Sequence, residues 1–96
     1  MRELVKSPLA ENDLKRIWHY TNEKWGASKA TEYLLALDKG MKALIDNPKM
    51  GQPRDYIRRG YRSIQINRHV VYYRLNSNII DVVRVLHERM SADTHL

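Results

Sequence analysis

The chain has 96 residues, of which 43% are hydrophobic and none is cysteine, and its formal net charge is +6 at pH 7. This length allows one small domain with one core, and the apolar share excludes a disordered chain. The lack of cysteine excludes a disulfide scaffold and thiolate chemistry, and it suits a reducing cytoplasm. Because no stretch approaches the about 20 apolar residues of a membrane span or signal-peptide proportions, we expect a soluble cytoplasmic protein that contacts no membrane.

The first half of the chain predicts a short strand followed by two helices. Residues 2–6 form the strand, and Ser7-Pro8 opens a helix, because serine can cap and proline suits a first turn that needs no N–H. Gly26 ends this helix. Apolar residues recur at intervals of three and four over residues 30–45, and Asn47-Pro48 ends the second helix. So short a link between helices predicts an antiparallel hairpin.

Three features of this hairpin carry further expectations. Trp18 and Trp25 lie on the apolar face of the first helix, so we expect them in the core rather than in a ligand site. Asp13 belongs to the polar side of the same helix. Gly40, inside the second helix, costs about 1 kcal/mol relative to alanine and marks a close approach to a strand or to the other helix.

The second half predicts a loop and three strands. Residues 49–60 contain Gly and Pro breaks and form the loop. Strands follow at residues 61–67, 70–75 and from residue 79 onward, with turns at Arg68-His69 and at residues 76–78. The order β-α-α-β-β-β predicts an α+β fold, an antiparallel sheet with the helical hairpin packed on one face. We expect a single domain over residues 1–90 and a loose tail over 91–96.

The last strand contains a charge that needs a partner. Arg84 sits within a nearly continuous apolar run, residues 79–86. A basic side chain in that position must find an acceptor or lean out to solvent. A carboxylate such as Asp55 or Asp81 is the expected partner.

The positive charge lies mainly in the second half of the chain. Residues 1–48 hold eight Lys or Arg against seven Asp or Glu, whereas residues 49–96 hold nine against four, and eight of those nine are Arg. Arginine favours flat, bidentate contacts with carboxylate or phosphate. We therefore expect this half to face an acidic protein or a nucleic acid, with an ordinary solubilising surface as the alternative.

The histidines give little sign of a catalytic or metal site. His19, His69, His87 and His95 follow no metal-ligand spacing, and no glycine-rich phosphate loop is present. We interpret His19 as a surface residue and His69 as a turn residue. His87 ends the last strand among arginines and fits either a strand-end hydrogen bond or general acid–base work in RNA cleavage. The residues alone favour a basic binding surface over an active site.

Several short motifs, taken together, resemble a known family. They are Trp25-Gly26, Asn47-Pro48-x-Met50-Gly51, Asp55-x-Ile57-Arg58-x-Gly60-Tyr61-Arg62, Val71-x-Tyr73-Arg74 and Ile80-Asp81-Val82-Val83-Arg84-Val85-Leu86-His87-x-Arg89-Met90. In order and spacing this series resembles the ParE toxins of the RelE/ParE superfamily, which belong to bacterial type II toxin–antitoxin systems. One departure is Ser91, where the family pattern leads us to expect Asp.

The resemblance implies a RelE/ParE-like fold and a non-enzymatic toxin that inhibits DNA gyrase and so blocks replication. We expect no cofactor, metal or small-molecule substrate. A ParD-like antitoxin would neutralise the toxin by laying a helix and an extended tail along the groove between hairpin and sheet. The residues expected to contact target or antitoxin are Arg58, Arg59, Arg62, Arg74, Arg84, His87, Arg89 and Met90.

Two alternatives remain open at this stage. RelE-like toxins are ribosome-dependent mRNA endonucleases on the same fold, so fold alone does not decide the function. In that case His87, Arg62 and Arg84 would be the catalytic candidates. Against it, no aromatic residue follows Tyr73, where RelE-like enzymes use a C-terminal aromatic. The other alternative is a domain that binds its antitoxin but has lost toxicity.

Overall fold

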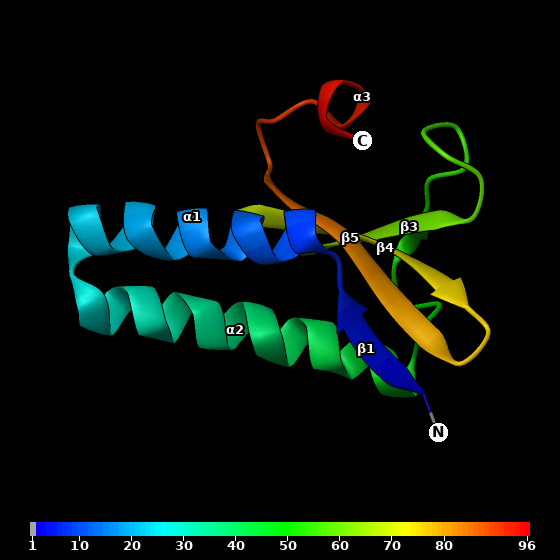
Figure 1. Ribbon diagram of the computed structural model, residues 1–96, viewed down its shortest axis with the longest axis horizontal. Helices are drawn as coiled ribbons and strands as arrows, with labels where there is room; N and C mark the ends of the chain where they lie inside the picture. Colours follow the sequence, from blue (N-terminus) through cyan, green and yellow to red (C-terminus); the bar gives the residue numbers. More distant parts are fainter. Residues whose placement is uncertain (1) are drawn as a thin grey trace.

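A five-stranded sheet carries a long helical hairpin on one face in the computed structural model, which describes residues 2–96 (Figure 1). The elements in chain order are β1 (Glu3–Lys6), α1 (Pro8–Trp25), α2 (Ala27–Asp46), β2 (Gln52–Pro53), β3 (Tyr61–Ile66), β4 (His69–Asn76), β5 (Ile79–His87) and α3 (Ala92–His95). The strand order across the sheet is β1-β5-β4-β3-β2. None of the described helices is long and apolar enough to cross a membrane.

The predicted α+β fold is confirmed, with one refinement in the sheet. β5, β4, β3 and β2 pair antiparallel, but β1 lies parallel to β5, with Glu3 opposite Ile79 and Lys6 opposite Val82. Parallel neighbours need a long crossover between them, and here the whole chain from α1 to β4 supplies it. The sheet is therefore mixed rather than purely antiparallel.

The core lies between the hairpin and the near face of β4 and β5. Its buried side chains come from both layers: Ala10, Ile17, Leu37 and Met41 from the helices, and Val71, Val82 and Val85 from the strands. The close approach predicted at Gly40 is confirmed, because a Cβ added there would lie 2.8 Å from Ile66 Cγ1 on β3. Glycine at this position leaves the space that the Ile66 side chain occupies against α2.

The expectation of a core position was wrong for Trp25, whose residue surface is 71% exposed. The hairpin extends beyond the edge of the sheet, and Trp25 lies at its far end, next to the turn between α1 and α2 (Figure 1). The apolar face of α1 therefore continues past the layer that could bury it. Trp18, nearer the sheet, is half-buried.

A β-bulge in β5 shapes the junction between sheet and α1. Tyr72 of β4 lies opposite Arg84, but Tyr73 lies opposite Val82, so Val83 is the extra residue. The Ser7 hydroxyl donates to the Val83 carbonyl at 2.7 Å and caps α1 as predicted, by accepting from the Ala10 amide at 3.0 Å. The bulge thus ties the first turn of α1 to the part of β5 that β1 does not pair with.

Asp13 forms a second link between α1 and β5, although its place on the polar side of α1 led us to expect an exposed side chain. It is buried, and its carboxylate accepts hydrogen bonds from Arg84 Nε at 2.8 Å, Arg84 Nη2 at 2.9 Å and the Val85 amide at 3.0 Å. The expected partners of Arg84 were wrong: Asp81 pairs instead with Arg74 at 3.4 Å, and Asp55 accepts from a loop amide. β1 ends too early to cover this part of β5, so α1 does so.

Smaller differences concern the tail and the turns. The tail expected to be loose forms the short helix α3, and the His95 carbonyl accepts a hydrogen bond from Arg84 Nη1 at 2.8 Å. The turn between β3 and β4 lies one residue earlier than predicted, at Asn67 and Arg68, with Asn67 at a φ of 55°. His69 therefore begins β4 rather than closing the turn.

Candidate functional site

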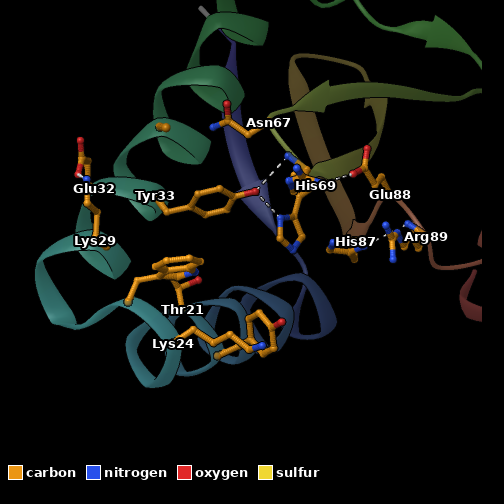
Figure 2. Close-up of a pocket in the computed structure, with 14 residues that line it drawn as sticks. Thr21, Lys24, Lys29, Glu32, Tyr33, Asn67, His69, His87, Glu88 and Arg89 are labelled. Atoms are coloured by element: carbon orange, nitrogen blue, oxygen red, sulfur yellow. Dashed lines mark hydrogen bonds and ion pairs between the residues drawn. The ribbon is translucent and has the colours of Figure 1, made fainter.

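An open groove of about 1350 Å³ lies between the far half of the hairpin and the end of the sheet where β4 begins and β5 finishes (Figure 2). α1 and α2 form one wall, and the turn before β4 together with the segment after β5 forms the other. The lining residues are Tyr20, Thr21, Lys24, Trp25, Lys29, Glu32, Tyr33, Ala36, Asn67, Arg68, His69, His87, Glu88 and Arg89.

Tyr33 and His69 form the floor of the groove. Tyr33 Oη lies 2.6 Å from His69 Nδ1, and the Arg68 amide donates to the same hydroxyl at 3.2 Å (Figure 2). Burial, with the neighbouring His87 ring, lowers the pKa of His69 from 6.5 to about 4, and burial raises the pKa of Tyr33. His69 is therefore neutral near pH 7 and shares a hydrogen bond with the Tyr33 hydroxyl through Nδ1.

His87 lies directly beside this pair. Its ring meets the His69 ring edge-on, with centroids 5.3 Å apart and an interplanar angle of 87°. Its Nδ1 accepts a hydrogen bond from the Arg89 amide at 3.1 Å. This geometry matches the strand-end hydrogen bond, the first of the two interpretations of His87.

The turn and the segment after β5 are locked together by Glu88. Its carboxylate contacts Arg68 Nη1 at 3.3 Å and accepts from Gln65 Nε2 at 2.9 Å, and its amide donates to the Arg68 carbonyl at 2.9 Å. Arg68 and His69 were not among the predicted site residues, because the sequence pattern placed both in a turn. The pairing of His69 with His87 across β4 and β5 brings them into the groove.

The rim of the groove combines exposed aromatic rings with positive charge. Tyr20 is 60% exposed and Trp25 is 71% exposed. Four basic side chains line the groove against two acidic ones: Lys24, Lys29, Arg68 and Arg89 against Glu32 and Glu88. Exposed apolar surface rimmed by charge is typical of a protein-binding site, and this one suits an amphipathic segment that carries carboxylates.

The predicted contact residues do not form one surface. His87 and Arg89 line the groove, and the neighbouring Met90 is 38% exposed. Arg58 and Arg59 are exposed on the loop before β3, beside the end of that strand remote from the groove.

Three other candidates are held by contacts within the chain. Arg62 Nη1 donates to the Gly51 carbonyl at 2.7 Å, Arg74 pairs with Asp81, and Arg84 is bound between Asp13 and the tail. Their first role in this fold is therefore structural.

The catalytic set of the nuclease alternative is also dispersed. Arg62 lies opposite Tyr73 of β4, and His87 lies opposite His69. These two β4 positions are four residues apart, which is roughly 13 Å at the rise of a strand. Within residues 2–96, no arginine side chain is hydrogen-bonded to His87, and no group of three or more His, Cys, Asp or Glu is arranged to hold a metal.

Comparison with known proteins identifies the family. The family model described as ParE toxin of the type II toxin–antitoxin system parDE matches residues 4–92. Toxin ParE1 of Mycobacterium tuberculosis (strain H37Rv) is 41% identical over 91 residues, covering 94% of this chain and 93% of the relative. Toxin ParE1 of Caulobacter vibrioides is 38% identical over 96 residues, covering 100% and 99%.

The fold agrees with a solved structure. A chain of the chromosomal ParDE toxin–antitoxin system from P. aeruginosa superposes with a TM-score of 0.80 at 21% identity, covering 91% of this chain and 96% of the other. The match of sequence model, relatives and fold extends over nearly the whole length. The chain therefore belongs to the ParE family of toxins from bacterial type II toxin–antitoxin systems.

Proposed function

We propose that this toxin inhibits DNA gyrase in the bacterial cytoplasm, blocks replication, and is neutralised by a ParD-like antitoxin. The observation that carries the proposal is the match to the ParE toxin model over residues 4–92, reinforced by relatives named as ParE toxins over nearly their full length. The resemblance to ParE toxins implies gyrase as the target.

The geometry of the groove supports an inhibitor rather than a nuclease. A general acid or base works best with a pKa near the operating pH. Burial lowers the pKa of His69 well below neutrality, and its Nδ1 is already bonded to Tyr33. His87 accepts from a backbone amide, and Arg62 and Arg84 are occupied elsewhere.

The groove is the proposed antitoxin site. A helix with one apolar face would cover the exposed rings of Tyr20 and Trp25, and carboxylates beside that face would meet Lys24 and Arg89. This is helix-in-groove recognition, in which apolar anchors supply affinity and charge supplies orientation.

Pulse labelling in a bacterium tests the target. The toxin is expressed without antitoxin, and incorporation of labelled thymidine and of a labelled amino acid is followed in parallel. We expect DNA synthesis to fall first and antitoxin co-expression to restore it. Earlier loss of protein synthesis would favour the ribosome-dependent nuclease, and unaffected growth would show a domain without toxicity.

A single substitution tests the antitoxin site. Trp25→Ala removes the most exposed ring of the groove, and a tryptophan anchor contributes about 2 kcal/mol or more, roughly 30-fold in affinity. Leu35→Ala is the matched control, because Leu35 is 63% exposed on α2 and does not line the groove. Titration with the purified antitoxin should show a loss for Trp25→Ala alone. Equal affinities for both variants would place the antitoxin elsewhere.

A further inference from the structure

The loop between β2 and β3 presents arginines on a braced backbone. The Arg54 amide donates to the Tyr61 carbonyl at 2.7 Å, and the Tyr61 amide donates to the Arg58 carbonyl at 3.0 Å. Asp55 Oδ1 accepts from the Gly60 amide at 2.8 Å, and Gly60 has a φ of 83°, a conformation that glycine adopts without strain. The exposed side chains of this loop are therefore carried by a fixed main chain.

The charge around this loop is strongly positive. Arg58 and Arg59 are exposed and form no ion pair within residues 2–96. The sheet places two further arginines nearby. Arg74 of β4 lies opposite Tyr61, and Arg62 follows Tyr61 in β3. The arginines of the loop and the adjoining strand ends are Arg54, Arg58, Arg59, Arg62 and Arg74, whereas the acidic residues are Asp55 and Asp81. Asp81 pairs with Arg74, and Asp55 accepts from a loop amide without forming an ion pair with Arg58 or Arg59.

An exposed aromatic ring accompanies these charges. Tyr56 is 78% exposed, and its hydroxyl accepts from Arg54 Nη1 at 3.4 Å. The same guanidinium donates through Nε to Ser63 Oγ at 2.8 Å and through Nη2 to Gln52 Oε1 at 3.0 Å. Arg54 thereby fixes one end of the ring and leaves its faces to solvent.

We propose that this arginine loop, residues 54–60, binds the phosphate backbone of DNA. Protein interfaces are organised around a buried apolar anchor. The exposed rings that line the groove, Tyr20 and Trp25, lie at the other end of β3 and β4, whereas Tyr56 is a single exposed ring among arginines. The loop instead combines unpaired guanidinium groups, which match phosphate oxygens, with an exposed tyrosine, whose hydroxyl is another group that contacts phosphate. DNA binding by this loop rests on the proposed function, because gyrase holds DNA. An experiment without gyrase distinguishes failure of DNA binding from failure of gyrase inhibition.

The test is fluorescence anisotropy of a labelled DNA duplex with the full chain over a salt series from about 50 to about 200 mM. Each phosphate contact contributes about 0.9 to the slope of log K against log salt. Arg58→Ala/Arg59→Ala should therefore reduce that slope by about two and weaken binding roughly tenfold or more near 0.1 M salt. Circular dichroism checks that the double variant keeps its fold.

The matched control is Lys15→Ala/Arg16→Ala, which removes the same charge from exposed positions on α1. We expect it to leave the slope nearly unchanged. Equal losses in both double variants would mean that net charge alone attracts the DNA, and absence of binding at low salt would overturn the proposal. Loop-dependent binding to polyglutamate in preference to the duplex would also overturn it, by assigning the surface to an acidic protein.

Discussion

Substitution of Asp13 by asparagine should destabilise this toxin more than any exposed charge change. The Asp13 side chain is 6% exposed, that of Arg84 is 12% exposed, and the carboxylate accepts three hydrogen bonds, including one from the Val85 amide. Asparagine keeps the volume but leaves the Arg84 charge buried without its counter-ion and brings an amide donor toward other donors. Breaking a buried pair in this way costs about 3–5 kcal/mol.

Such a loss is a large share of the about 5–15 kcal/mol that stabilises a domain of this size. Each kcal/mol shifts Tm by about 4–8 °C at this chain length, so Tm should fall by at least about 12 °C in a thermal melt followed by circular dichroism. Asp38→Asn is the matched control, because Asp38 is half-exposed in surface pairs with Lys42 and Lys6, and such pairs contribute about 1 kcal/mol or less.

A double variant distinguishes the missing partner from the missing packing. Asp13→Leu/Arg84→Met removes both charges and should lose less stability than Asp13→Asn alone, because no buried charge remains unpaired. A Tm for Asp13→Asn within about 2 °C of the parent would refute the assignment of this pair as the link between α1 and β5.

Three further outcomes follow from buried contacts. Tyr73→Phe should cost about 1–3 kcal/mol in urea denaturation, because the hydroxyl donates to the Pro48 carbonyl at 2.8 Å and accepts from the Gly51 amide at 2.9 Å, and both would remain buried and unpaired; an unchanged midpoint would contradict this. Burial lowers the pKa of His69 to about 4 from 6.5, so the unfolded chain binds a proton that the folded chain does not, and stability is lost as pH falls from 6.5 toward 4. In Tm measured against pH, His69→Gln should lack this part of the slope, and identical slopes would show that His69 is not protected from protonation. Gly40→Ala should lower Tm despite a helix-propensity gain of about 1 kcal/mol, since the new Cβ overlaps a β3 side chain; a raised Tm would mean that α2 adapts easily.

Local chemistry explains what the sequence could reveal. The cap at Ser7, the stop at Gly26 and the close approach at Gly40 each depend on neighbouring residues or on one residue type, and all three are present in the structure. Hydrophobic periodicity likewise predicts both long helices and the last three strands, because the spacing of apolar residues indicates which face of an element is buried.

Long-range geometry explains what the sequence missed. The partner of Arg84 lies 71 residues away, and only the bulge at Val83 and the early end of β1 bring Asp13 to it. Trp25 has the helical spacing of a core residue, but no sheet extends far enough to cover it. The exposure of Trp25 depends on how far the helical hairpin extends past the sheet, and no local sequence pattern encodes that distance.

The groove illustrates the same limit for function. His87 and Arg89 were predicted as contact residues, and they line it. His69 joins them as the first residue of β4, where it pairs with His87, and Arg68 lies in the turn just before it. A difference of one residue between the predicted and the observed turn therefore determines whether His69 is assigned to the turn or to the strand that forms the floor of the groove.

The most direct measurement of the central claim uses purified gyrase and antitoxin-free toxin. Supercoiling of relaxed plasmid is followed beside cell-free translation of a reporter message, with the same protein preparation in both. We expect blocked supercoiling, or cleaved DNA trapped on gyrase, while translation continues. Stalled translation with cut message and fully active gyrase would contradict it and would make the groove around His87 a nuclease site.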